Sequence, residues 1–173
     1  MARSGAGSQH YRARMSSVYG RGATPQTPDD PDAKRAALLR AVDEIRPILE
    51  ASSDETEESR TLAPAAVQAL RESGLFALKV PRELGGAEAD PIVQMDVIEA
   101  VTLIDPAASW AMLISSAVTG ATSARLPDEA IDVLYEGGRL PCMACTLKPS
   151  GGATRVDGGY RITGRWSWGS GIE

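Results

Sequence analysis

Histidine and cysteine are scarce in this sequence of 173 residues, which contains one histidine, His10, and two cysteines, Cys142 and Cys145. A structural zinc centre needs four nitrogen or sulfur ligands, and these three residues cannot supply them. The cysteines lie in the apolar stretch LPCMACTL, which is predicted to be a strand, where positions three apart point to opposite faces. We therefore predict two buried free thiols and no metal site.

Long apolar runs and the common catalytic motifs are also absent. No stretch approaches the roughly 20 apolar residues that a membrane helix requires. The sequence has no Gly-Lys pair, which excludes a Walker loop, and no HExxH or G-x-S-x-G motif. Its N-terminal region lacks the apolar core and cleavage site of a secretory signal. We therefore expect a cytoplasmic protein without a membrane association.

Basic residues are outnumbered, with 18 lysines and arginines against 23 aspartates and glutamates. Four of the arginines lie in the first 28 residues, which contain no acidic residue, so the remainder is more acidic still. Nucleic-acid binding requires a basic surface, and we exclude it here. Residues 1–29 are rich in small and polar residues without apolar periodicity, and they are predicted to be a disordered tail.

What the sequence does contain is a series of helical patterns between residues 30 and 138. Asp30 and Pro31 begin the first helix as a cap and a first-turn proline. Pro47 is expected to bend or end this helix early, and residues 52–60 to form a solvated acidic loop. Further helices are predicted to begin at four prolines, Pro64, Pro91, Pro106 and Pro127.

The helix that begins at Pro106 is apolar or small nearly all round, so we expect it to be buried on most sides. Its interior hydroxyl groups have two interpretations. They line a pocket, or they bond back to carbonyls of their own helix.

After Gly137 and Gly138 the pattern changes to strands and turns. LPCMACTL is predicted to be a strand covered on both faces, and Asp157, Gly158 and Gly159 to form a hairpin turn. Three strands cannot close a core or cover their own edges. Residues 139–173 are therefore expected to be the start of a β-domain that has been cut off.

The stretch GGYRITGRWSWGSG, residues 158–171, alternates with a period of two, which predicts a half-buried strand. One face carries Tyr160, Ile162, Trp166, Trp168 and Ser170. A planar ring system could lie against Trp168 while Ser170 bonds to its edge. The same pattern also fits an aromatic pair in the core of a sheet.

Three segments, GLFALKVPRELGGAEADP, IEAVTLIDPAASWAMLISSAVTG and GGYRITGRWSWGSGIE, resemble the acyl-CoA dehydrogenase superfamily in their order and spacing. The resemblance extends from about Ala33 to the last residue. Within the superfamily, the chain looks most like the oxygenase components of two-component flavin-dependent monooxygenases. The implied fold class is α+β, with a helical N-terminal domain (30–138) followed by the first strands of a truncated β-barrel or sandwich domain (139–173).

The resemblance also implies a flavin cofactor, FMN or FAD, and favours the flavin over the core interpretation of Trp168. In the superfamily, a tryptophan and a hydroxyl residue two positions later lie against the flavin ring. Trp168 and Ser170 hold those positions here, and Thr146 and Leu147 match the preceding flavin-facing strand. The helix over 106–120 would line the substrate side. This implies a substrate pocket at two residues, Trp110 and Ser116.

One departure from the superfamily bears on the chemistry. Dehydrogenases of the superfamily typically carry Thr-Glu-Pro-Gly, and Lys148 stands here in the place of the glutamate. This favours an oxygenase that hydroxylates an aromatic or polycyclic small molecule with flavin from a separate reductase. The alternatives are an acyl-CoA dehydrogenase and a non-catalytic remnant or helical interaction module.

The superfamily's C-terminal helical bundle, which supplies the catalytic base and the oligomer interface, has no counterpart in these residues. The resemblance therefore assigns no catalytic base here. It implies that the chain is inactive alone and that a full-length form is a homo-oligomer.

Overall fold

The structure, a computed structural model, describes residues 27–136, 140–148 and 150–170. In these residues five α-helices precede one two-stranded antiparallel sheet, which confirms the α+β class with the helical part first. The predicted tail over 1–29 lies almost wholly outside the described residues. Within them, no helix is long and apolar enough to cross a membrane.

The first helix, α2, is much longer than expected and runs over Pro31–Ser59. The predictions of an early end at Pro47 and of a loop over 52–60 are both wrong. Pro47 is exposed, so the Asp43 carbonyl that loses its helical donor faces water. The buried stripe of Leu38, Val42, Ile45 and Leu49 continues through Ser52 and Thr56 at the same spacing.

Hydroxyl groups keep the second half of α2 in place. Ser52 Oγ donates to the Ile48 carbonyl at 2.7 Å, and Thr56 Oγ1 accepts from Ala63 N at 3.1 Å. Arg60 then ends the helix in the left-handed region, at φ 59°. The acidic residues of 52–60 therefore lie on the outer side of a helix whose inner side is held by serine and threonine.

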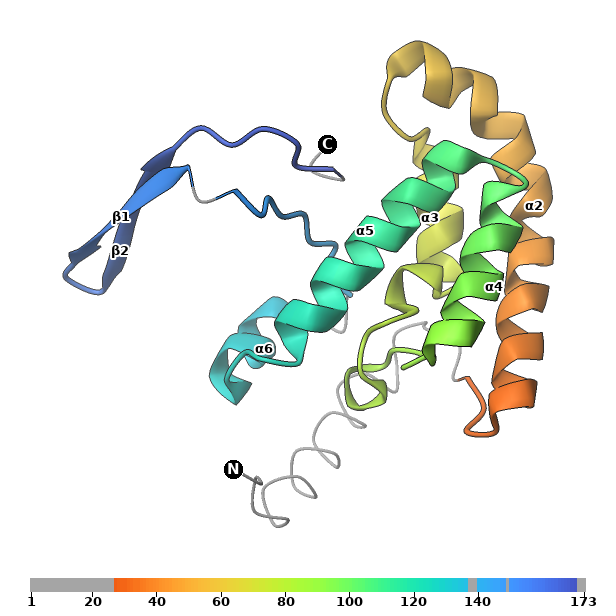
Figure 1. The fold of residues 1–173 in the computed structure, drawn as a ribbon, viewed down its shortest axis with the longest axis horizontal. Helices are drawn as coiled ribbons and strands as arrows, with labels where there is room; N and C mark the ends of the chain where they lie inside the picture. The colour runs from red at the N-terminus through yellow and green to blue at the C-terminus, as the bar shows by residue number, and fades with distance from the viewer. Residues whose placement is uncertain (1–26, 137–139, 149, 171–173) are drawn as a thin grey trace.

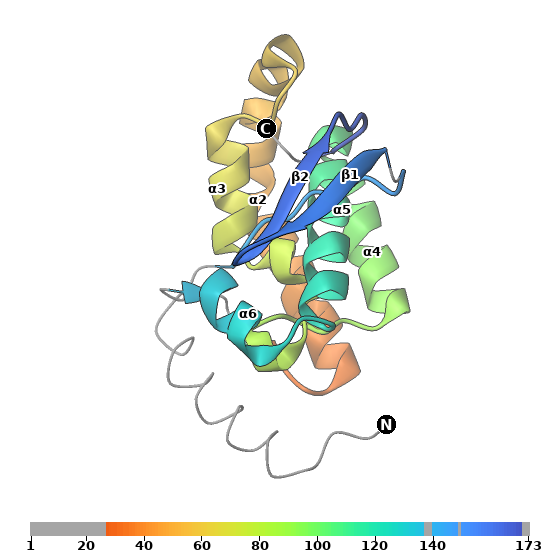
Figure 2. The same ribbon diagram turned by 90° about the vertical axis from the view of Figure 1, so that its left-hand side faces the viewer.

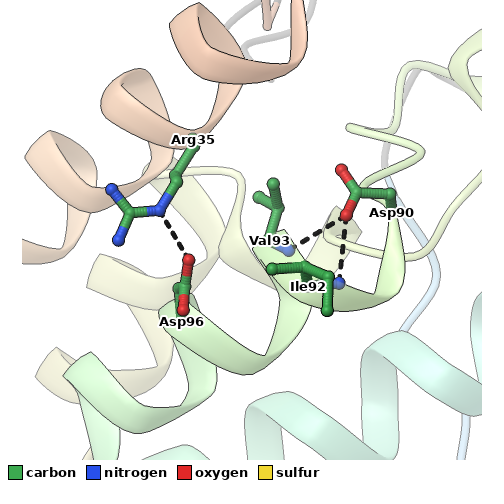
Figure 3. A network of polar contacts seen from close by, with 5 residues as sticks. All are labelled: Arg35, Asp90, Ile92, Val93 and Asp96. Carbon is green, nitrogen blue, oxygen red and sulfur yellow. Dashed lines mark hydrogen bonds and ion pairs between the residues drawn. The ribbon is translucent and has the colours of Figure 1, made fainter.

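The remaining helices begin where the prolines predicted. They are α3 (Pro64–Glu72), α4 (Pro91–Thr102), α5 (Pro106–Ser123) and α6 (Asp128–Leu134), with 3-10 turns η1 (Leu75–Ala77) and η2 (Arg82–Leu84) between α3 and α4. Gly74 follows α3 at φ 79°, a conformation that favours glycine. Asp90 Oδ1 caps α4 by accepting from Ile92 N and Val93 N, as Figure 3 shows.

The helices α2, α3, α4 and α5 pack around one hydrophobic core, in which α5 lies beside α4 and packs on η1 (Figures 1 and 2). An ion pair between Arg35 Nε and Asp96 Oδ2, 2.5 Å apart, joins α2 to α4 at the surface (Figure 3). A second, smaller core cluster connects the segment after α3 to α6. It contains Ala77, Val80, Leu84, Ile131 and Tyr135.

The sheet consists of β1 (Gly151–Val156) and β2 (Gly159–Gly164), paired from Gly151 with Gly164 to Val156 with Gly159. The turn between them, with Gly158 at φ 76°, confirms the predicted hairpin. Both strands are exposed on both faces, so the predicted half-buried strand is wrong. Figure 1 shows the hairpin set apart from the helices.

The predicted strand LPCMACTL is also wrong, because residues 140–147 form no strand. The segment is instead held against the helices by side chains. Thr119 Oγ1 donates to the Pro141 carbonyl and accepts from Met143 N, both at 3.2 Å. Of its apolar side chains, Leu140 packs against the two core clusters, whereas Leu147 is exposed.

Candidate functional site

A cavity of about 700 Å³ lies between the C-terminal end of α2, α3, the first half of α5 and the two segments that leave the open end of the hairpin. A volume of this size is typical of small-molecule sites. The α2 and α3 side contributes Ser53, Thr56, Glu57, Arg60, Thr61, Leu62, Val67, Arg71 and Phe76. The opposite side contributes Asp105, Pro106, Ala107, Trp110, Ala111, Ser115, Cys142, Gly169 and Ser170.

The unexpected length of α2 creates one wall of this cavity. Ser53, Thr56 and Glu57 lie in the part of the helix beyond Pro47. The bond between Thr56 Oγ1 and Ala63 N fixes the return of the chain into α3. Had α2 ended at Pro47, this side of the cavity would not exist.

Arg71 closes the cavity on the α3 side. Its guanidinium donates to the Leu140 carbonyl at 3.2 Å and to Cys142 Sγ at 3.3 Å. These two bonds draw the segment 140–148 over α3. Arg71 therefore positions this part of the cavity wall, and both of its terminal nitrogens already donate a hydrogen bond.

Two polar groups in the wall have no hydrogen-bond partner among the described residues. They are Asp105 Oδ2 and Ser115 Oγ, on side chains that are only 3% and 6% exposed. The other carboxylate oxygen, Asp105 Oδ1, caps α5 by accepting from Ala107 N at 2.8 Å and Ala108 N at 3.0 Å. Buried polar groups are normally paired, but these two oxygens are ten residues apart on α5 and are covered by protein, so they do not form one polar site.

Two of the predicted site residues meet at the cavity. Trp110, half of whose surface is exposed, donates from Nε1 to Ser170 Oγ at 3.2 Å. Both residues line the cavity, although they lie 60 positions apart in the sequence. Ser170 keeps its own proton available because it accepts from the indole.

The remaining predicted flavin-contacting residues lie outside the cavity wall. Trp168 is 93% exposed and adopts φ 64°, and Leu147 is 94% exposed. Thr146 is partly buried, and its Oγ1 accepts from Lys148 N at 3.4 Å. The interpretation of Trp168 as part of a sheet core is wrong, because its indole is open to solvent.

Ser116, the second predicted substrate-pocket residue, is fully buried and does not line this cavity. Its Oγ accepts from the backbone of Lys79 at 2.9 Å and so joins α5 to the segment after η1. Burial of the middle of α5 is as expected. However, Ser109, Ser116 and Thr119 bond to other segments rather than to carbonyls of α5 itself.

The prediction of two buried thiols is wrong, because Cys142 and Cys145 are free but exposed. The error follows from the strand assignment, since a segment lying on the surface of α3 and α5 leaves one side open. Within the described residues, no group of three or more histidine, cysteine or acidic side chains could hold a metal ion.

Asp105 and Ser115 are not among the site residues predicted from the sequence. Asp105 was visible only as a helix cap before Pro106, and one serine among several on α5 gave no sign of being unpaired. The lack of a partner at these two oxygens depends on how other segments pack around α5, which the sequence does not show.

Comparison with known families shows which family the chain belongs to. Residues 33–131, more than half of it, match the family described as "Acyl-CoA dehydrogenase, N-terminal domain". The chain belongs to this family. The acyl-CoA dehydrogenase-like helical part inferred from the sequence is thereby confirmed, and it contains α2–α6 and most of the cavity wall.

The relatives of this acyl-CoA dehydrogenase-like chain are hydroxylating enzymes. It is 30% identical over 142 residues to "Pigment production hydroxylase" of Rhodococcus sp., covering 81% of this chain and 36% of that one. It is 26% identical over 138 residues to "Flavin-dependent monooxygenase, oxygenase subunit HsaA" of Rhodococcus jostii, covering 78% and 35%. The chain thus spans about a third of the length of these relatives.

The chain is also similar in fold to solved structures of other proteins. The structure of "XiaF from Streptomyces sp. in complex with FADH2 and Glycerol" superposes with a TM-score of 0.75 at 29% identity, covering 80% of this chain and 35% of that one. The HsaA monooxygenase from M. tuberculosis superposes with a TM-score of 0.71 at 26% identity, covering 80% and 37%.

Proposed function

We propose that the chain forms the N-terminal part of the oxygenase component of a two-component flavin-dependent monooxygenase that hydroxylates an aromatic or polycyclic small molecule. The observation that carries this proposal is the similarity, in sequence and in fold, to flavin-dependent monooxygenases. Such a system includes a separate reductase that supplies reduced flavin. Homo-oligomerisation and a cytoplasmic location belong to the same proposal and rest on the resemblance alone.

The residues present fit a flavin ring. The indole of Trp168 offers an aromatic face that is almost completely exposed, so a planar ring can stack on it without displacing packed side chains. Ser170, two residues later, accepts from Trp110 and retains a proton to donate to the ring edge. Thr146 and the exposed Leu147 would contact the flavin from the neighbouring segment.

When bound, reduced flavin supplies the electrons that activate dioxygen for insertion of one oxygen atom into the substrate. The residues of this chain would bind and orient the reactants. Trp168 would stack on the flavin ring, Ser170 would hydrogen-bond to the ring edge, and the cavity beside Ser170 would hold the substrate. We place the catalytic base outside the described residues. Because the chain spans about a third of its relatives, we expect the 173 residues alone to bind ligands without turnover.

Flavin fluorescence tests the proposal. Titration of the chain into a fixed concentration of FMN or FAD should quench flavin emission, because an indole stacked on the ring quenches it. Trp168→Ala should abolish the quenching and Ser170→Ala should weaken binding several-fold, by about one hydrogen bond. Trp166→Phe is the matched control, since Trp166 packs over Gly151 and Gly164 of the hairpin. Unchanged flavin emission up to millimolar protein would overturn the assignment of Trp168 as the residue on which the flavin ring stacks.

A further inference from the structure

One hydrogen bond joins the segment after the hairpin to the helical part of the chain. Trp110 Nε1 donates to Ser170 Oγ at 3.2 Å. Among the described residues, no other hydrogen bond connects the stretch 150–170 to a helix. The two strands are exposed on both faces, so they do not hold this stretch against the helices. The Trp110 indole therefore provides the polar contact that fixes Ser170 beside α5.

The two ends of this bond differ in how firmly they are held. Trp110 lies in the second turn of α5, between Ala108 and Met112, which are buried in the main core. Asp105 caps the start of the same helix. Ser170, by contrast, belongs to an irregular stretch that follows β2 and has no strand partner. The helix therefore positions the serine, and not the reverse.

The direction of the bond determines what the Ser170 hydroxyl can still do. An indole nitrogen donates and cannot accept, so Ser170 Oγ is the acceptor in this pair. The hydroxyl proton of Ser170 then points away from Trp110 Nε1 and has no acceptor among the described residues. The serine is thus prepared to donate to a group on its other side.

Trp168 lies between two anchored neighbours. On one side Trp166 packs over Gly151 of the hairpin, and on the other side Ser170 is held by Trp110. Trp168 itself adopts φ 64°, a left-handed conformation that is costly for a bulky residue. Such a conformation persists only where the surrounding structure imposes it. The bond at Ser170 is therefore one of the contacts that keep the Trp168 indole in its exposed position.

We propose that Trp110 is a positioning residue that fixes the place and the proton direction of Ser170 and, through Ser170, the exposed conformation of Trp168. Its effect on flavin rests on the proposed function, in which Ser170 and Trp168 contact the ring. The positioning itself does not depend on flavin. Trp110 thereby has a role beyond lining the cavity, because loss of its N–H group alone should alter the flavin contact.

The indole N–H resonances of the flavin-free chain test the positioning by NMR. The chain has three tryptophans, and single substitutions by phenylalanine assign their indole signals. Ser170→Ala should shift the Trp110 indole signal, because water replaces the serine as acceptor. Trp110→Phe should in turn shift the backbone amides of Trp168 and Ser170. Ser167→Ala, at an exposed serine of the same stretch, is the matched control and should leave the Trp110 signal in place.

A double-mutant cycle measures the consequence for flavin. Trp110→Phe keeps an aromatic ring in the cavity wall but removes the donor, and it should weaken the binding of FMN about threefold, within the range expected for one hydrogen bond. Because Trp110 acts through Ser170, the variant with both Trp110→Phe and Ser170→Ala should bind FMN no more weakly than Ser170→Ala alone. Flavin emission should still be quenched at saturation in all three variants, since each retains Trp168.

The outcomes separate this inference from the proposed function. An unchanged Trp110 signal in Ser170→Ala would overturn the positioning, whether or not flavin binds. Losses of affinity that multiply in the double variant would also overturn it, because Trp110 would then contribute to flavin binding independently of Ser170. The expected NMR shifts in a chain that does not bind FMN would support the positioning and contradict only the proposed function.

Discussion

Two of the buried serines of α5, Ser109 and Ser115, differ in whether the hydroxyl has a partner, and their substitution should have different effects on stability. Ser115→Ala removes a buried group that is unpaired and should leave the free energy of unfolding unchanged or raise it by about 1 kcal/mol. Ser109→Ala removes the hydroxyl that bonds to Thr102 and to the Ile98 carbonyl, and it should lower the free energy of unfolding by about 1 kcal/mol. Urea denaturation of both variants measures the difference. Equal losses would show that Ser115 Oγ is paired in the protein.

Tyr135 makes stability depend on alkaline pH. Burial raises the pKa of its phenol above the ordinary value of about 10, and the 2.7 Å hydrogen bond with Ser123 partly opposes the shift. Because the folded-state pKa is the higher one, the unfolded chain loses the proton first. This contribution to stability is therefore complete below about pH 10 and is lost as the pH rises through the folded-state pKa.

Denaturation at increasing pH checks this expectation. Tyr135→Phe should be less stable at neutral pH by about 1 kcal/mol, for the lost hydrogen bond, but should lose less stability between pH 9 and about pH 11. Tyr160→Phe, at an exposed tyrosine of the hairpin, should retain the alkaline loss of the unmodified chain. A parallel decline in all three proteins would contradict the assignment to Tyr135.

Single residues were predictable where their role is local. Asp105 caps α5 with its side chain beside the predicted helix start at Pro106, and Gly74 ends α3 through its own backbone conformation. The partner of a side chain from a distant segment was not predictable. Ser116 was assigned to a pocket and instead accepts from Lys79, whereas Trp110 and Ser170, both inferred from the resemblance, do meet at the cavity.

At the scale of elements, α2 shows what apolar periodicity misses. The stripe changes from leucine, valine and isoleucine to Ser52 and Thr56 while its spacing continues, so a hydrophobic pattern ends where the helix does not. LPCMACTL gives the opposite error. It is bonded through its backbone to Thr119 of α5 and forms no strand, and apolar composition alone does not distinguish such a segment from a strand.

Pro47 is tolerated in α2 at a measurable cost. Pro47→Ala restores the missing N–H donor for the Asp43 carbonyl and removes the clash of the ring with that turn. The unfolded chain gains conformational entropy, which offsets part of the benefit. We expect a net rise of about 1–2 kcal/mol in the free energy of unfolding by thermal or urea denaturation. A decrease would mean that the proline sets a bend on which the packing of α2 depends.

The crossing of α5 with the segment after η1 requires a glycine. A Cβ atom at Gly120 would lie 2.5 Å from the Lys79 carbonyl oxygen, one helical turn beyond the Ser116 bond to the same residue. Gly120→Ala should therefore lower the free energy of unfolding by about 1–3 kcal/mol, more than the helix preference of alanine returns. Gly152→Ala, where a Cβ atom meets nothing within 4 Å, is the control. Equal stability of the two variants would show that α5 can move away from Lys79 without loss.

At the scale of the whole molecule, the hydrophobic core and the candidate site are built from different parts of the chain. The described core clusters consist of residues from the helical part, with Leu140 packed against them. The cavity uses Cys142 and Ser170, and the proposed flavin contact uses Trp168, all from the segments beside the hairpin. The order of elements followed from prolines, caps and glycines, but the site needed the fold because its two sides come from segments that are far apart in the sequence, residues 53–76 and residues 105–170.

The openness of the hairpin on both faces has a consequence for hydrogen exchange. The ladder between β1 and β2 can open without breaking the helical core, so its amides should exchange with solvent through local fluctuations. The central amides of α2, α4 and α5 exchange only when the core itself unfolds. A ligand that contacts both the cavity and the Trp168 indole would couple the hairpin to the helical core. It should therefore slow amide exchange most in the hairpin, which has the least protection in the free protein.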